Sequence, residues 1–187
     1  VAYSLLGLAL VMLDALDEAL PLLEEAVIRT GELGVKAYLA LWKTHLAEGL
    51  LAVGQMARAK VLAEEALELA IVHQERGHQA YALRLLGEIA ARAEARDLDR
   101  AEKSLTQAQA LAEELGMRPL LGRILLSLGE VYRLGGDHGK AEAHIFRAIN
   151  LFREMDMRHW LEEAATQLKA LADYRLVALF RRSEIEA

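Results

Sequence analysis

The glycine-rich segment Gly135-Gly136-Asp137-His138-Gly139-Lys140 contains residue types that bind nucleotide phosphates. A phosphate-binding loop needs a glycine five residues before Gly139 and a hydroxyl residue directly after Lys140. Leu134 and Ala141 stand at these two positions, and no predicted strand precedes the segment. The segment is therefore expected to be a turn between helices.

The other titratable side chains form no catalytic or metal-binding pattern. The six histidines never take the His-Glu-x-x-His arrangement of a helical zinc site, and cysteine is absent. Paired carboxylates suited to acid–base catalysis occur at Glu24-Glu25 and Glu64-Glu65. They recur at one place in a repeated pattern, which is typical of a solvated face. We expect no enzyme activity, no metal and no cofactor.

Composition favours a folded, all-α protein. Of the 187 residues, 54% are hydrophobic and 27% are charged, and only two are proline. The net charge of −6 argues against binding to a nucleic-acid backbone. The most apolar run, residues 1–13, is too short to span a bilayer, so no membrane partner is expected. The absence of cysteine fits a cytoplasmic location.

The elements that carry these residues follow a repeat of about 40 residues. Alanines recur at Ala19, Ala59, Ala101 and Ala141, with separations of 40, 42 and 40 residues. A small residue preceded by leucine lies 12 or 14 residues before each of them, in Leu6-Gly7, Leu46-Ala47, Leu86-Gly87 and Leu128-Gly129. A second alanine follows seven residues later, at Ala26, Ala66, Ala108 and Ala148. Such a period indicates a stacked repeat.

Each repeat is predicted to be a pair of helices in close contact. The expected pairs are residues 2–13 and 18–29, 36–52 and 57–73, 79–93 and 100–115, and 119–134 and 139–155. The small residues of the first helix are expected to face the alanines of the second, at an interaxial distance of about 8 Å. Gly34, Gly77 and Gly116 are expected to end the second helices, and Asp17 and Asp99 to cap helices.

This pattern resembles the tetratricopeptide repeat, whose signature combines a Leu-Gly pair in the first helix with two alanines in the second. Leu128-Gly129, Tyr132, Ala141 and Ala148 match that signature almost completely. The resemblance covers residues 1–157 and implies a right-handed superhelical solenoid. The period exceeds the family's usual length of roughly 34 residues. The expected units are residues 1–34, 35–77, 78–116 and 117–157, followed by a capping helix and tail in residues 158–187.

Two segments, residues 112–120 and 152–162, resemble the closing repeats of large bacterial regulators. Those proteins join a class III nucleotide cyclase or a kinase to a predicted ATPase and a C-terminal tetratricopeptide array. The chain also begins with valine inside an expected helix, so we expect a fragment of a longer protein. After the repeats, residues 158–171 are predicted to form a capping helix, and residues 176–180 a short docked helix or a tail.

In this family the first helices line a concave groove that binds a protein or peptide partner. The resemblance carries the groove positions onto Thr44, His45, Glu48, Leu51, Arg84, Leu85, Glu88, Arg92, Leu126, Ser127, Glu130 and Arg133. Glu48, Glu88 and Glu130 share one repeat position and would form an acidic ladder. Family members that clamp a peptide carboxylate use Asn there, so no such clamp is expected. The alternative is a set of surface ion pairs between these carboxylates and nearby arginines.

The first predicted helix is apolar on every side, which is typical of a helix that is covered on every side. Leu5, Leu8, Val11 and Met12 are therefore predicted to mediate self-association. Together these observations predict a non-catalytic protein-interaction and regulatory scaffold of a larger bacterial signalling protein. The alternatives are a homo-oligomerisation module and a small-ligand sensor.

Overall fold

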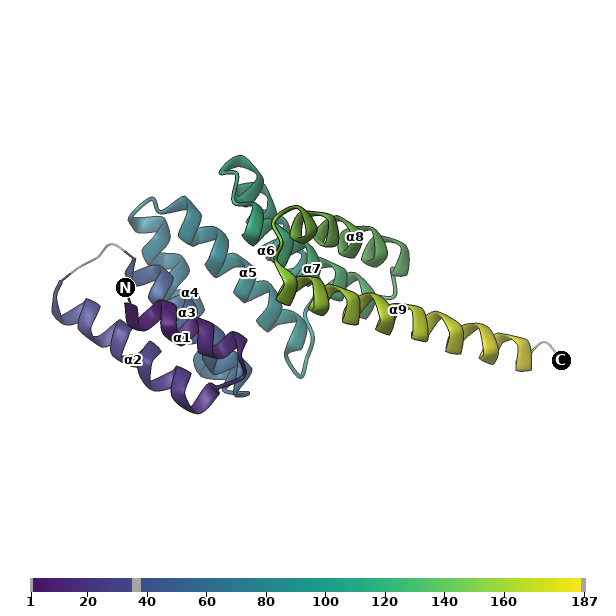
Figure 1. The fold of residues 1–187 in the computed structure, drawn as a ribbon, viewed down its shortest axis with the longest axis horizontal. Helices are drawn as coiled ribbons and strands as arrows, with labels where there is room; N and C mark the ends of the chain where they lie inside the picture. Colours follow the sequence, from purple (N-terminus) through teal and green to yellow (C-terminus); the bar gives the residue numbers. More distant parts are fainter. Residues whose placement is uncertain (1, 35–37, 186–187) are drawn as a thin grey trace. The chain divides into compact units, whose positions relative to one another are not determined.

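A computed structural model describes residues 2–34 and 38–185, with side chains described as far as residue 173. Within this part of the chain every regular element is an α-helix, and nine helices follow one another (Figure 1). Their bounds are α1 Ala2–Met12, α2 Leu16–Glu32, α3 Leu39–Ala52, α4 Met56–Val72, α5 Arg76–Arg92, α6 Leu98–Glu114, α7 Arg118–Leu134, α8 His138–Glu154 and α9 Arg158–Ile185. The all-α class is confirmed. The predicted start of the third helix at residue 36 lies outside the described residues.

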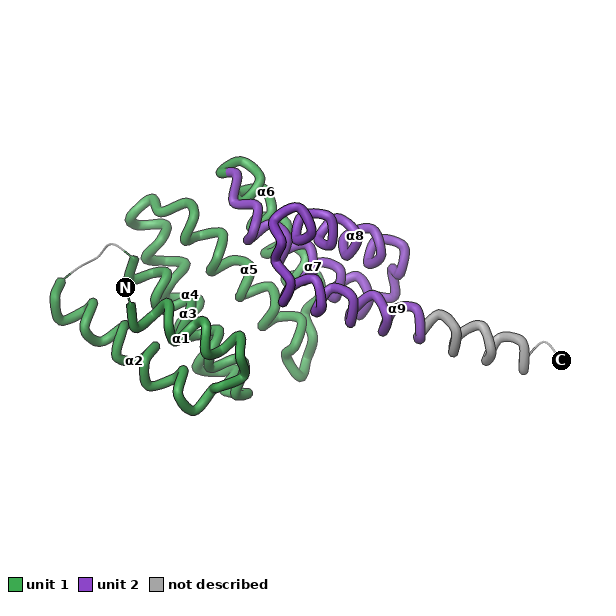
Figure 2. The backbone as a smooth tube through the Cα atoms, in the orientation of Figure 1, with its two compact units in different colours: residues 1–115 green, residues 116–187 purple. Residues whose placement is uncertain are grey.

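The helices form two compact units, Val1–Leu115 and Gly116–Ala187 (Figure 2). In the first unit, α1 packs on α2 and α3, α3 packs on α4 and α5, and α5 packs on α6. In the second unit, α8 packs on both α7 and α9. Within each unit, every helix thus contacts its neighbours in sequence, which is the packing of a helical repeat.

Close contact between the helices of a pair is confirmed at the small residues. A Cβ atom added to Gly87 would lie 3.1 Å from the Ala101 carbonyl oxygen and 2.6 Å from Leu105 Cγ. A Cβ atom added to Gly7 would lie 3.2 Å from the Ala19 carbonyl oxygen. The backbones therefore approach each other where the repeated glycines and alanines meet, because neither contributes a bulky side chain.

Most helices of the array are separated by a turn with one residue in the left-handed conformation. Gly34 and Gly116 take this role with φ of 62° and 64°, as the sequence predicts. The expectation for Gly77 is wrong, because this residue lies inside α5. Since α4 ends at Val72, the left-handed position falls earlier and is taken by Gln74 with φ of 56°.

Aspartate caps two helices, although not the residues that the sequence indicates. Asp99 lies inside α6, and Asp97 caps this helix by accepting a hydrogen bond of 2.9 Å from the Arg100 N–H. Asp17 lies in the first turn of α2, which has no side-chain cap. Asp137 caps α8, and this hydrogen bond is the main reason why the pKa of its carboxyl is lowered.

The terminal helix is longer than predicted. The α9 backbone continues from Arg158 to Ile185, through the segment 176–180 whose side chains lie outside the described part. Its first half packs on α8, where Trp160 stacks on Phe152 with ring centroids 6.1 Å apart. Buried Leu171 joins the same apolar cluster, so this part of α9 covers the last helix pair.

Candidate functional site

The predicted binding face lies on the first helices of the pairs. In the first unit the first helices of the pairs are α1, α3 and α5, and their backbones lie side by side. Among the described elements, the second helices α2 and α4 contact these first helices and do not contact each other. The first helices therefore form the more tightly packed layer. This layer carries the predicted groove residues of α3 and α5, and α7 carries those of the second unit.

Burial divides the twelve predicted groove residues into two halves. The buried six are Thr44, His45, Leu51, Arg84, Leu85 and Leu126. The other six retain some exposure and are Glu48, Glu88, Arg92, Ser127, Glu130 and Arg133. The buried side chains offer no surface to a partner, because α3 and α5 are covered by neighbouring first helices as well as by their own second helices. Partner binding therefore stays a prediction for the exposed half.

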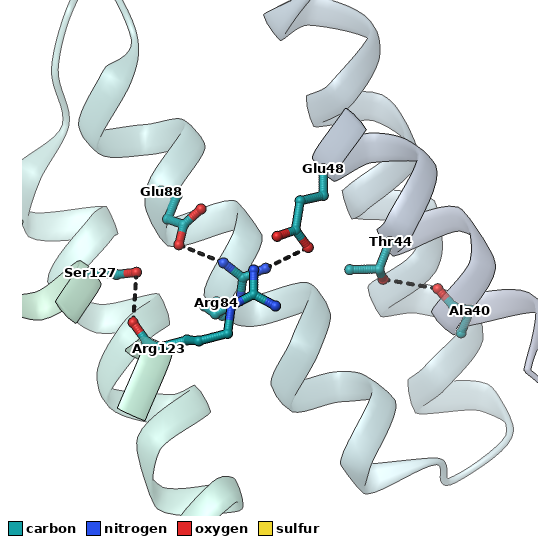
Figure 3. Close-up of polar contacts among 7 residues, drawn as sticks. All are labelled: Ala40, Thr44, Glu48, Arg84, Glu88, Arg123 and Ser127. Atoms are coloured by element: carbon teal, nitrogen blue, oxygen red, sulfur yellow. Dashed lines mark hydrogen bonds and ion pairs between the residues drawn. The ribbon is translucent and has the colours of Figure 1, made fainter. Parts of the chain in front are cut away.

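A buried arginine joins two of the predicted ladder carboxylates (Figure 3). The guanidinium of Arg84 donates to Glu88 on its own helix at 2.5 Å and to Glu48 on α3 at 2.9 Å. The Arg84 side chain is 1% exposed, and the two carboxylate side chains are 15% and 16% exposed. Burial opposes the charge of Arg84, but the two carboxylates outweigh this effect and raise its pKa.

This cluster links α3 to α5 through ion pairs from Arg84 to both carboxylates. Since a buried cation without partners would be strongly destabilising, Glu48 and Glu88 are required for the burial of Arg84. Their first role is therefore structural. The pair formed with Glu88 could be predicted from the four-residue spacing, whereas the pair with Glu48 joins two helices and could not.

Glu130, the third carboxylate of the predicted ladder, lies in the second unit and has its own partner. Both of its oxygens accept hydrogen bonds from the guanidinium of Arg133, at 2.6 and 2.7 Å. This hydrogen bonding is the main cause of the raised pKa of Arg133. On the same helix, the Ser127 hydroxyl donates to the Arg123 carbonyl at 3.1 Å (Figure 3).

The buried polar residues of α3 are satisfied by neighbouring helical groups. The Thr44 hydroxyl donates to the Ala40 carbonyl at 2.9 Å. His45 Nδ1 and the hydroxyl of Ser4 on α1 are hydrogen-bonded at 2.9 Å, and both residues are buried. These groups hold α1 against α3, because an unpaired buried polar group would destabilise the fold.

Helix α1 exposes a continuous apolar surface, here called the α1 stripe. Its large exposed side chains are Tyr3, Leu5, Leu6 and Met12, with exposed fractions of 41%, 54%, 53% and 37%, and Leu13 in the turn that follows is 76% exposed. Two other predicted self-association residues, Leu8 and Val11, are partly buried, and Val11 packs against the core of the first unit. Leu6 and Leu13 were missed because the sequence pattern does not separate the faces of a helix that is apolar all round.

The repeat shows what covers the equivalent surface elsewhere. Forty residues after Leu5 and Leu6 stand His45 and Leu46 of α3, which are 3% and 5% exposed. A further forty residues on, the equivalent residues of α5 are buried as well. Helix α3 is contacted by α1, and α5 is contacted by α3, so in both cases the preceding first helix packs against the helix that carries these positions. Leu5 and Leu6 of the α1 stripe therefore occupy stacking positions of the repeat.

The segments considered for chemistry have structural roles. Glu24 forms an exposed ion pair with Arg58, and Glu64 forms one with Arg100, both at 3.2 Å. Residues 135–137 form a turn between α7 and α8. Within residues 2–34 and 38–185, no group of His, Cys, Asp or Glu is placed to hold a metal ion. The same residues include no helix long and apolar enough to cross a bilayer.

The fold and this face define an all-α helical-repeat protein. A similar solved structure is the crystal structure of BtubC (BKLC) from P. vanneervenii, with a TM-score of 0.62 and 27% sequence identity. The match covers 82% of this chain and 63% of that chain, so this chain matches less than two thirds of its length. No protein-family model and no curated protein matches the chain.

Proposed function

We propose that this chain is a non-catalytic protein-interaction scaffold of the tetratricopeptide type. The resemblance of its closing repeats to bacterial regulators supports a regulatory role in a larger cytoplasmic signalling protein. The observation that carries the proposal is the α1 stripe, because exposed apolar surfaces of this kind mark interaction sites.

The occupant that fits the stripe best is a second copy of the chain. No charged residue occurs from Ala2 to Leu13, so two stripes meet without burying a charge. A two-fold contact places the same residues on both sides, and Leu5 and Leu6 then pack against their own equivalents. The equivalent positions of α3 and α5 are buried against helices, which supports a helix as the covering element.

Sedimentation of the chain over a range of concentrations tests this proposal. The wild type is expected to show a concentration-dependent mass, and Leu5→Glu is expected to be monomeric because a charge would be buried in the contact. Val61→Glu on α4 is the matched control, since Val61 has the same exposed fraction of 54%. A wild type that stays monomeric at every concentration, or two variants with equal effects, would refute self-association.

Groove binding is a second candidate function, supported by the carboxylates that keep some exposure beside Arg84. Because the Glu48 and Glu88 carboxylate side chains remain 15% and 16% exposed, a basic segment of a partner protein suits them. An oligolysine peptide is the probe, and Glu88→Gln is expected to weaken its binding at low salt. Glu65→Gln on the outer face of α4 is the control. If both variants weaken oligolysine binding equally, the binding reflects the overall negative charge of the chain, and groove binding is refuted.

A further inference from the structure

A cavity of about 200 Å³ lies in the first unit, where α5 ends and the connection to α6 begins. Its wall is formed by one residue of α4, the last turns of α5, the connection and the first turn of α6. The lining residues are Lys60, Leu86, Ile89, Ala90, Ala93, Ala95, Asp97 and Arg100. This cavity is separate from the Arg84 cluster and from the α1 stripe.

The cavity forms where this repeat is longer than the others. Five residues, 93–97, separate α5 from α6, whereas three residues separate the helices of the other pairs, at 13–15, 53–55 and 135–137. Each short turn contains one residue in the left-handed conformation, at Asp14, Gly54 or Gly136. This residue reverses the chain direction within the turn, so the second helix begins directly after it. In the longer connection all residues have negative φ, and Ala95 and Asp97 form a wall beside the end of α5.

The lining combines an apolar interior with three charged side chains, Lys60, Asp97 and Arg100. Leu86 and Ile89 belong to the buried core, and the three alanines add further apolar surface. The Asp97 carboxylate already accepts the capping hydrogen bond from the Arg100 N–H, and the Arg100 guanidinium pairs with Glu64. In the part of the chain that the structure describes, Lys60 makes no ion pair.

We propose that this cavity is a binding site for a small carboxylate with a short apolar chain. The chain would lie against Leu86 and Ile89, and the carboxylate would pair with the Lys60 ammonium at the opening. The cavity has room for roughly six water molecules, which sets the ligand size at about that of hexanoate. The site does not depend on the interaction surfaces proposed above.

Titration of the full chain with straight-chain carboxylates, from butanoate to hexanoate, tests this site. Affinity is expected to rise roughly fourfold with each methylene that enters the cavity. Hexanol, which lacks the charge, is expected to bind about tenfold more weakly than hexanoate, because it cannot form the ion pair. Amide NMR shifts of Ala90, Ala93 and Ala95 locate the binding. Hexylammonium binding as tightly as hexanoate would overturn the assignment of charge.

Substitutions at the opening and inside the cavity complete the test. Lys60→Met is expected to weaken hexanoate binding about tenfold, with Lys103→Met on the exposed face of α6 as the matched control. Ala90→Leu fills the cavity and is expected to abolish binding without lowering thermal stability. Saturable binding that Lys60→Met reduces and Lys103→Met does not reduce supports the site. Absence of saturation up to the solubility limit, or equal loss in both lysine variants, overturns it.

Discussion

At the contact between the two helices of each pair, the residue on the first helix is small when a specific residue on the second helix is large. Glycine stands at this position in three repeats, and the residues that a Cβ atom there would meet first are Leu23, Leu105 and Ile145. The second repeat has Ala47 instead, and its residue equivalent to Leu23 is Ala63. A methyl group on one side and a branched side chain on the other are therefore expected to exclude each other.

Replacing Gly87 by alanine tests this rule. The new Cβ atom would lie 2.6 Å from Leu105 Cγ, whereas carbon atoms pack best at about 3.5–4.0 Å. Overpacking of this kind costs about 1–3 kcal/mol, and the better helix propensity of alanine recovers about 1 kcal/mol. Gly87→Ala is therefore expected to lower the free energy of unfolding by about 1 kcal/mol.

The same substitution should have the opposite sign when Leu105 is shortened. Leu105→Ala alone is expected to cost about 2–5 kcal/mol because it leaves a cavity. In that background the closest remaining neighbour of the new methyl group is the Ala101 carbonyl oxygen at 3.1 Å, and Gly87→Ala should stabilise the chain by up to about 1 kcal/mol. The double variant reproduces the Ala47 and Ala63 combination of the second repeat, with a coupling energy of about 2 kcal/mol.

Urea unfolding followed by far-ultraviolet circular dichroism gives the four free energies of this cycle. Gly31→Ala is the control, because a Cβ atom added at this helical position would meet no atom within 4 Å. It is expected to stabilise α2 by up to about 1 kcal/mol through helix propensity. If Gly87→Ala has the same effect in the wild-type chain and in the Leu105→Ala variant, steric exclusion does not explain the pattern.

Three further predictions concern charge, pH and turn conformation. Arg84→Met should lower the free energy of unfolding by about 3–5 kcal/mol in urea titrations, because it leaves two carboxylates facing each other. Asp137→Ala should remove a helix cap. Because the hydrogen bond from the Lys140 N–H lowers the pKa of Asp137 below 3.8, its contribution is complete above that pH and is lost as pH falls through the folded-state pKa. Thermal unfolding should therefore show the gap between the variant and the wild type closing under strong acid. Gly54→Ala should cost about 1–2 kcal/mol because φ is 79° there, whereas Gln74→Gly should be neutral or stabilising, as judged by melting temperature.

The helical repeat could be predicted because the contact between paired helices depends on residue size. Ala19, Ala59, Ala101 and Ala141 are all 0% exposed, so their spacing reports helix packing directly. Turn and cap details could not be predicted to the residue. Several polar residues occur near each helix end, and the one that caps depends on where the helix starts, which packing decides.

The exposed face of the first helices was harder to predict because exposure depends on neighbouring repeats. The sequence of α1 and that of α5 both place leucine at the position of Leu5 and Leu85, but the first is 54% exposed and the second is 0% exposed. No local pattern separates these two residues. Their difference comes from the preceding first helix, which is present for α5 and does not occur among the described residues for α1.

At one repeat position, burial could not be predicted from residue type, because three of its four residues are polar. Ser4, Thr44, Arg84 and Leu126 occupy equivalent places, and all four are buried. The first three are polar, and the family resemblance assigns Thr44, Arg84 and Leu126 to a face open to a partner. Leu126 is the residue that indicates burial. An apolar residue at this position in one repeat suggests that the equivalent positions are buried in every repeat that has neighbours on both sides. If this position is buried, the Arg84 guanidinium requires carboxylates nearby to compensate its charge. Glu88 on the next turn of α5 and Glu48 on α3 are the residues that pair with it.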